Sequence, residues 1–398
     1  VAGAATNRTG GYSDWRMPTI KELYSLILYT GVNGPSVTDT TGYVPFIDTN
    51  YFGFTYGPGT SDTVGQRVID CQDWSATEYV STVMNGVAAV FGVNFADGRI
   101  KGYSKYTGNG AANTLYVRYV RGNPAYGKNQ FVDNQDATIT DLATGLMWPG
   151  ADSGKGMDWP SALAWVQTQN AAKYLGYSDW RLPNIKELQS IVDYTRSPAT
   201  TASPAIDTRY FTSTGITNEA GQADYPYVWS GTILIDGPIP SGNYISFGRA
   251  MGYMNGTWMD VHGAGSMKSD ILVGNPANYP NGRGPQGDAI RIYNYVRLVR
   301  TANGQSSSGP VLPSINPGGV VTAGTFGAFP SIAPGAWIEI YGSNLGTGSR
   351  AWTGADFNGI HAPTSLDGTT VTIGGQPAFI AYVSPSQVNA QAPSNLAT

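Results

Sequence analysis

The sequence predicts an α+β fold in which two copies of one compact domain precede a separate β-sandwich. Three observations lead to this prediction. A thirteen-residue segment occurs twice in the chain. Each copy holds one segment of helical periodicity among short alternating strands and glycine-rich loops. The last part of the chain contains only short alternating segments between glycine and proline turns, which is typical of a sandwich.

The strongest signal is the internal repeat. Gly11–Leu23 recurs as Gly176–Leu188 with two of thirteen positions changed, and three further pairs of blocks follow in the same order. These pairs are Asp48–Phe52 with Asp207–Phe211, Trp74-Ser75 with Trp229-Ser230, and Tyr116–Arg121 with Tyr295–Arg300. We therefore expect a first domain at residues 1–125 and a second at residues 126–302.

The two copies differ in length. The second copy is longer in its later loops, from Gly231 to Asp288, and long loops on a fixed scaffold are where recognition usually occurs. It also begins with the segment 141–148 and a helical stretch from Trp159 to Ala172, which have no counterpart in the first copy. The first copy is therefore expected to lack about thirty residues at its start.

Apolar spacing predicts one helix in each copy. Pro18 suits the first helical position, where its missing N–H costs nothing. The residues that share one helical face are Ile20, Leu23, Tyr24 and Ile27 in the first copy and Ile185, Leu188, Ile191 and Val192 in the second. Alternation predicts strands at Val90–Phe95 and Tyr116–Val120.

The character of the chain changes after a linker at residues 303–312, where Gly304–Pro310 is rich in serine and glycine. Alternating strands are expected at Trp337–Gly342, Thr370–Ile373, Ala378–Val383 and Gln387–Gln391, with a hairpin turn at Gly374-Gly375. These strands predict a β-sandwich at residues 313–398. Its final strands are expected to lie beyond Thr398.

Composition excludes several classes of function. Only 13% of residues are charged, against about 25% in a typical soluble domain. The net charge is -4 and no run of Lys or Arg occurs, so no nucleic-acid footprint is present. No stretch reaches the ~20 apolar residues of a transmembrane segment. Cys71 is the one cysteine and forms no intrachain disulfide, which leaves a buried small hydrophobe or a link to another chain.

Charged residues around the repeated tryptophan suggest either an acid–base set or a structural clamp. The clamp is favoured, because charged groups beside a tryptophan at a helix entrance usually form hydrogen-bonded pairs. The residues are Asp14, Trp15, Arg16 and Glu22 in the first copy, and Asp179, Trp180, Arg181 and Glu187 in the second. Arg118, Arg121, Arg297 and Arg300 are interpreted in the same way. No catalytic residue is predicted.

The long loops of the second copy hold the candidate ligand-binding residues. Tyr244, Tyr253, Trp258, Tyr279 and Tyr293 could stack on sugar rings, bury in a protein interface or pack within the loops. Asp260, Asp270, Asn275, Asn278, Asn281 and Asp288 carry oxygens of the kind that calcium prefers. His262 and His361 are the only histidines and have no zinc-ligand spacing, so no metal site and no cofactor are predicted, with calcium as the alternative.

The repeated motifs resemble a known family. Gly176–Leu188, the preceding Asp141–Trp148, Trp229-Ser230 and Tyr295–Arg300 are similar to the DUF1566 family, the C-terminal domain of the Legionella collagen-like adhesin. The resemblance covers residues 1–302 and implies a C-type-lectin-like fold, an extracellular or cell-surface location, and roles in adhesion or surface assembly. Ile332–Gly335, Ile340–Leu345, Leu366–Gly368 and Ser384–Pro393 resemble an uncharacterised Ig-like module of secreted acidobacterial proteins.

Two functions are carried forward from the sequence. The first is a non-enzymatic extracellular structural protein that assembles with itself into a surface fibre, because head-to-tail contacts between repeated domains generate open filaments. The alternative is a carbohydrate-binding cell-surface adhesin. The expected partners are other copies of the chain and, for the adhesin, glycans.

Overall fold

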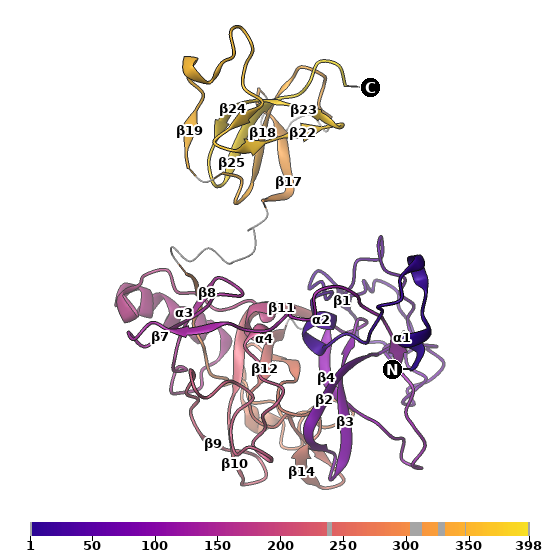
Figure 1. The fold of residues 1–398 in the computed structure, drawn as a ribbon. Coiled ribbons are helices and arrows are strands. Elements are labelled where there is room, and N and C mark those ends of the chain that lie inside the picture. Colours follow the sequence, from indigo (N-terminus) through magenta and orange to yellow (C-terminus); the bar gives the residue numbers. More distant parts are fainter. Residues whose placement is uncertain (1, 237–240, 303–312, 325–330, 347, 397–398) are drawn as a thin grey trace. The chain divides into compact units, whose positions relative to one another are not determined.

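The computed structural model describes residues 2–236, 241–302, 313–324, 331–346 and 348–396 (Figure 1). The chain divides into two compact units, residues 1–305 and residues 306–398, which are described separately. The linker expected at residues 303–312 lies outside the described residues. Both units consist mostly of β-strands, and the few helices are short and belong to unit 1 apart from one 3-10 turn.

Unit 1 is organised around one eight-stranded sheet with the order β1-β11-β12-β15-β4-β3-β2-β5. The first copy contributes β1 (Val32–Asn33), β2 (Asp73–Val83), β3 (Val87–Asn94), β4 (Arg99–Ser104) and β5 (Tyr116–Val117). The second contributes β11 (Tyr227–Asp236), β12 (Ser241–Ser246) and β15 (Met267–Ile271). β4 and β15 pair antiparallel, with Ile100 opposite Met267, so the two copies share one sheet.

The two halves of this sheet are related by an approximate twofold axis at the β4–β15 seam. From the seam outward, the order β4-β3-β2 in the first copy repeats as β15-β12-β11 in the second. β1 departs from this pattern, because it belongs to the first copy and pairs parallel with β11 of the second. The arrangement is the intramolecular counterpart of an isologous dimer.

Reciprocal lysine contacts follow from this symmetry. Lys21 Nζ donates to the carbonyl oxygen of Ser190 at 2.6 Å, and Lys186 Nζ donates to that of Ser25 at 2.8 Å. Lys21 corresponds to Lys186 in the repeat, and Ser25 to Ser190. Each lysine thus satisfies a carbonyl at the C-terminal end of the other copy's helix, where helices lack internal partners.

The repeated helices are α2 (Ile20–Tyr24) and α4 (Ile185–Ser190). Thr19 and Asn184 are their N-caps, and each forms a capping box with the glutamate three residues later. Pro18 therefore precedes the cap, and its expected place at the first helical position is wrong. The helices are also shorter than the apolar pattern suggests, although Ile20, Leu23, Ile27, Ile185, Leu188, Ile191 and Val192 are all buried in one core.

The Trp-Ser blocks explain how the helices attach to the sheet. The Thr77 hydroxyl on β2 accepts a hydrogen bond from the Ile20 amide at 2.9 Å, and Thr232 on β11 accepts from Ile185 at 3.0 Å. Ser75 and Ser230 each donate to a carbonyl of the neighbouring strand. The first helical N–H groups, which lack partners within a helix, are therefore satisfied by the sheet.

The remaining elements of unit 1 surround this sheet. The helical stretch expected at Trp159–Ala172 is α3 (Trp159–Ala171), and α1 (Ala2–Thr6) occupies the position in the first copy that the end of α3 has in the second. The expected strand Val90–Phe95 lies largely within β3, whereas only Tyr116–Val117 of the next one is a strand. A four-stranded sheet has the order β16-β8-β7-β6, with β16 at Arg300–Thr301, β8 at Leu146–Pro149, β7 at Thr138–Asp141 and β6 at Phe131–Asp133. Two hairpins pair β9 (Ile216–Thr217) with β10 (Ala223–Asp224) and β13 (Met251–Met254) with β14 (Thr257–Asp260).

Unit 2 contains a five-stranded sheet with the order β17-β18-β25-β24-β19. These strands span Ser314–Thr322, Trp337–Ser343, Gln387–Gln391, Phe379–Val383 and Arg350–Ala351. Two small hairpins pair β20 (Ser365–Leu366) with β21 (Thr369–Thr370) and β22 (Thr372–Ile373) with β23 (Gln376–Pro377). Gly374 and Gly375, both at positive φ, form the turn of the second hairpin, so the turn joins β22 to β23 rather than to β24.

The reciprocal lysines provide a test of the symmetric interface. We expect Lys21→Met and Lys186→Met each to lower the free energy of unfolding of unit 1 by about 1–3 kcal/mol, because each removes a charged donor from a helix carbonyl. The double variant should show a loss near the sum of the two. Urea denaturation measures both, with the exposed Lys173→Met as control. Single variants as stable as the parent would contradict the interface role.

Candidate functional site

The repeated arginine and glutamate form the same ion pair in both copies. Arg16 Nη1 lies 2.7 Å from Glu22 Oε2, and the two Arg181–Glu187 contacts are both 2.6 Å. Each glutamate also accepts a backbone N–H from its helix cap at 2.8 Å. Burial alone would raise the pKa of Glu22, but Arg16 and Thr19 lower it below its usual value. Both carboxylates are thus fully engaged in holding the helix start.

The aspartates of the same motif are paired across each copy. Asp14 accepts from Arg121 at 2.8 Å, and Asp179 from Arg300 at 2.7 Å. Each arginine also lies over the ring of the motif tyrosine, Tyr12 or Tyr177. The motif tryptophans, Trp15 and Trp180, donate to nearby carbonyls at 3.0 and 2.8 Å. Arg118 and Arg297 bind the equivalent carbonyls of Gly53 and Thr212. These contacts join the charged and aromatic residues of each motif to one another and to nearby backbone carbonyls.

Three of the five candidate aromatics line one depression. Trp258, Tyr279 and Tyr293 enclose about 410 Å³ together with Tyr227, Tyr295, Pro226, Pro276 and Pro280, and we call this the aromatic hollow. Tyr253 packs edge-on against Trp258 at 5.4 Å between ring centroids. Tyr244 does not belong to this surface. It is 3% exposed on β12 and stacks on Tyr227 at 4.5 Å, so its ring faces are already covered within the core.

An ion pair forms part of the wall of the aromatic hollow. Arg291 binds Glu219 through two contacts of 2.8 and 3.0 Å, and its guanidinium lies 3.7 Å from the centre of the Tyr227 ring. Burial would raise the pKa of Glu219, but Arg291 lowers it below its usual value. Within the described part of the chain, Arg291 Nη1 and Asn294 Oδ1 have no hydrogen-bond partner. Both atoms are buried, so they lie behind the surface of the wall rather than on it.

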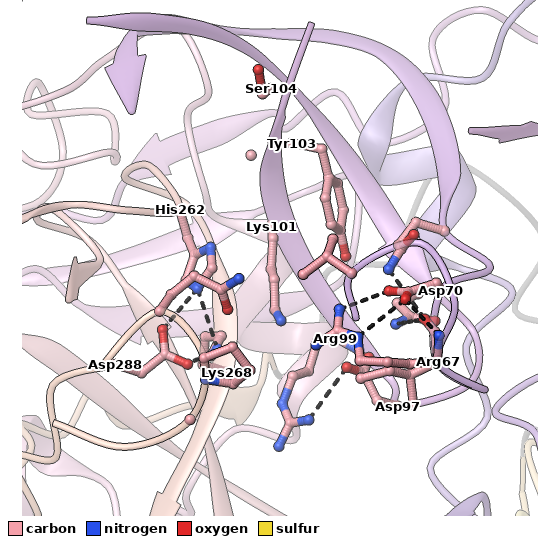
Figure 2. Close-up of a pocket in the computed structure, with 18 of the residues that line it drawn as sticks. Arg67, Asp70, Asp97, Arg99, Lys101, Tyr103, Ser104, His262, Lys268 and Asp288 are labelled. Carbon is pink, nitrogen blue, oxygen red and sulfur yellow. Dashed lines mark hydrogen bonds and ion pairs between the residues drawn. The ribbon is translucent and has the colours of Figure 1, made fainter. Parts of the chain in front are cut away.

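A larger depression lies at the seam between the two copies. It encloses about 860 Å³ and is lined by residues of β4, of β15 and of the loops around residues 67–72 and 283–290 (Figure 2). We call it the seam pocket. Figure 2 shows two groups of charged side chains, with Lys101 projecting between them. One group is His262, Lys268 and Asp288, and the other is Arg67, Asp70, Asp97 and Arg99.

The first group is a buried network from the second copy. His262 Nε2 lies 2.7 Å from Asp288 Oδ1 and 3.4 Å from Lys268 Nζ, and Lys268 also pairs with the other oxygen of Asp288. Burial, reinforced by Lys268, lowers the pKa of His262 to about 3, so its imidazole is neutral near pH 7. Burial would raise the pKa of Asp288, but Lys268 and His262 hold it well below its usual value.

The second group holds two arginines in place. Arg67 binds Asp70 at 2.7 and 3.1 Å, and Arg99 lies 3.3 Å from Asp97. Arg99 also donates to the Ser269 hydroxyl of the second copy at 3.1 Å, across the seam. Sequence reasoning missed the seam pocket, because its charged residues lie outside the repeated blocks and come from strands and loops distant in sequence. The available signals were His262 and Asp288, which lie within the long loops of the second copy.

The acidic loop residues considered for calcium are engaged separately. Asp260 accepts from the Tyr79 hydroxyl, Asp270 accepts from the Ile292 amide, and Asp288 belongs to the seam network. Asn275 caps a short 3-10 turn that ends at Asn278. Across the described residues, no group of three or more His, Cys, Asp or Glu side chains is arranged to hold a metal ion. The three aspartates and Asn275 thus each have a structural partner.

The structure also describes the surroundings of Cys71 and the length of the helices. Cys71 is 2% exposed, and burial raises the pKa of its thiol to about 12, so its side chain behaves as a small buried hydrophobe. Among the helices that the structure describes, none is both long and apolar enough to cross a membrane.

Fold and site together define a mostly β protein with two fused copies of one domain, whose polar pocket lies at their junction and whose aromatic hollow lies in the longer loops. The model of the Lcl C-terminal domain matches residues 1–121 and 137–254, which is more than half of the chain, and the chain belongs to this family. Unit 2 lies outside the matched residues. No curated protein and no solved structure matches the chain.

The buried histidine makes stability depend on pH. An unfolded His262 binds a proton below about pH 6.5, whereas the folded one stays neutral to about pH 3, so the free energy of unfolding falls as the pH drops through this window. A proton taken up on unfolding changes the unfolding constant by up to about tenfold per pH unit. We expect His262→Gln, whose amide can still donate to Asp288, to remove this contribution. Urea denaturation between pH 7 and 4 measures the change.

The comparison of the parent with His262→Gln isolates the contribution of His262 from those of other titrating groups. Burial raises the pKa values of Asp73, Asp260 and Asp270 to about 6, which favours the folded state as the pH falls. These carboxyls are common to the parent and the variant and therefore largely cancel in the difference. His361→Gln is the matched control, because the other histidine is exposed in unit 2. Equal pH dependence in the parent and His262→Gln would contradict the assignment.

Proposed function

We propose that this chain is a non-enzymatic adhesin of the cell exterior that binds carbohydrate through the aromatic hollow. The observation that carries the proposal is the convergence of Trp258, Tyr279 and Tyr293 on one depression beside the Glu219–Arg291 pair. The family supports the adhesive role, because the Lcl C-terminal domain occurs in the Legionella collagen-like adhesin. The same kinship supports an extracellular location.

The chemistry of the hollow suits a sugar ring. Apolar C–H faces of a pyranose pack against aromatic rings, which keep few rotatable bonds and lose little entropy on binding. Ring hydroxyls need nearby donors and acceptors, and Glu219 and the hydroxyls of the exposed Thr217 and Tyr293 line the hollow. A volume of about 410 Å³ lies within the ordinary range of small-molecule sites.

The charges of the hollow favour binding over catalysis. Glycoside hydrolysis requires two carboxyl groups, one of which is a general acid with a raised pKa. Glu219 is held as an anion by Arg291, which lowers its pKa instead. Its partner in the wall is an arginine rather than a second carboxyl group. The pair therefore suits the orientation of a neutral ligand.

Loss of the central ring tests the adhesin proposal. We expect Trp258→Ala to weaken binding of neutral glycans by at least about tenfold, because an aromatic contact at the centre of a site contributes more than 1.4 kcal/mol. A glycan array identifies the ligand, and titration calorimetry measures its affinity. Tyr51→Ala is the control, since Tyr51 is an 83% exposed aromatic outside the hollow. Binding that is unaffected by Trp258→Ala, or an array without a hit, would contradict the proposal.

A fibre of self-assembled chains is the second candidate, and one edge of the unit 1 sheet favours it. β5 is the edge strand beside β2, and Tyr116 and Val117 are 57% and 42% exposed there. An exposed strand edge can pair with a strand of another chain, and repetition of such a contact extends a filament. The low charge content of the chain leaves little repulsion to oppose it.

A substitution that places a charge on this strand edge tests the fibre proposal. We expect regular fibres of the parent chain at rising concentration, and we expect Val117→Lys to abolish them, because an edge lysine opposes strand addition. Electron microscopy and light scattering provide the readout. Val273→Lys, at an exposed apolar loop position, should leave the fibres intact. A parent chain that stays monomeric at all concentrations would rule out the fibre.

A further inference from the structure

The seam pocket is positively charged although the chain is acidic. Among the residues that the structure describes, five Lys or Arg line it, namely Arg67, Arg99, Lys101, Lys268 and Arg283, against three aspartates, Asp70, Asp97 and Asp288. The whole chain has a net charge of -4. Each of these aspartates is already paired with a cation of the pocket, so the part of the lining that the structure describes keeps a surplus of positive charge.

Lys101 is the centre of this surplus. It lies on β4, opposite Gly92 of β3, and its side chain projects between the two paired groups (Figure 2). No hydrogen bond or ion pair joins its ammonium group to any residue that the structure describes. Arg67, Arg99 and Lys268 each pair with an aspartate. The ammonium group of Lys101 is therefore available to pair with an anionic ligand.

Arg283 supplies a second cation at the rim. It is exposed, and its backbone pairs with that of Asp288 at 2.9 and 2.8 Å, which fixes the loop over the pocket. The position of this cation is therefore set by the same segment that carries the Asp288 carboxylate of the buried network.

The neutral part of the lining is rich in hydroxyl and amide groups. Its members include Ser104, Asn113, Thr114, Ser241, Ser269 and Gln286. Such groups pair with ligand hydroxyls in either direction, whereas the cations require an anion. The lining thus combines cations, which attract an anion, with several uncharged donors and acceptors of hydrogen bonds.

We propose that the seam pocket binds a small hydroxylated carboxylate, with Lys101 as the partner of the carboxylate. This site goes beyond the carbohydrate site proposed above, with which it shares only Ile290 as a lining residue. An ion pair in a partly enclosed pocket is less screened than one on an open surface, so it contributes affinity as well as orientation. The ligand is either a sugar acid or a hydroxy acid of another kind, which share this chemistry.

Titration calorimetry of the full chain tests the proposal with four probes: glucuronate, tartrate, glucose and inorganic phosphate. We expect glucuronate or tartrate to bind and glucose to bind at least tenfold more weakly, and the tighter of the two acids identifies the source. Binding should weaken with added salt. Glucose binding as tightly as both acids, phosphate binding more tightly than both, or no binding of either acid would overturn the proposal.

Single substitutions test which residues bind the acid. Lys101→Met keeps the aliphatic stem and should lower the affinity for the acid at least tenfold, and Arg283→Ala should lower it to a smaller extent. Lys155→Met, at an exposed lysine outside the pocket, is the control and should bind as the parent does. Trp258→Ala should retain acid binding, so a failure of the seam site and a failure of the aromatic hollow are distinguishable. Unchanged affinity in both Lys101→Met and Arg283→Ala would overturn the assignment.

Discussion

The antiparallel pairing of β4 with β15 is the contact on which the rest of unit 1 depends. It joins two half-sheets into one, and it places the helices α2 and α4 so that Lys21 and Lys186 reach the carbonyls of Ser190 and Ser25. The backbone amide of Gly102 also donates to the His262 carbonyl at 2.7 Å across the same seam. A side chain at Gly102 would meet that oxygen at 2.8 Å, so the close approach requires glycine.

The repeat made the local structure predictable. The helix caps and the arginine–glutamate pairs depend on residues within one motif, and they recur because the motif recurs. The sequence predicted α3, whereas the expected α+β class is confirmed only as a mostly β fold with few helices. Where the prediction failed, tertiary contacts decided. Tyr244 lies on β12, whose six residues are all buried, and no periodicity distinguishes an aromatic in such a strand from one in a loop.

The seam pocket was not predictable from this sequence for a physical reason. Arg99 and Ser269 are 170 positions apart, and nothing local specifies that β4 and β15 become neighbours. Composition pointed the other way, since a net negative chain without basic runs suggested no attraction for anions. The average charge of the chain does not describe a pocket whose charged residues come from two strands and several loops. The aromatic hollow was easier to anticipate, because Trp258 and Tyr279 lie within the longer loops of the second copy and Tyr293 follows them closely.

The fusion of two copies in one polypeptide has a consequence for the pocket at their junction. In a dimer of separate subunits, a site shared between the subunits disappears on dilution, because dissociation removes half of its walls. Here the second half is covalently tethered, and its effective concentration is that of an intramolecular partner. The seam pocket therefore exists in a single molecule, however dilute the surroundings into which that molecule is released.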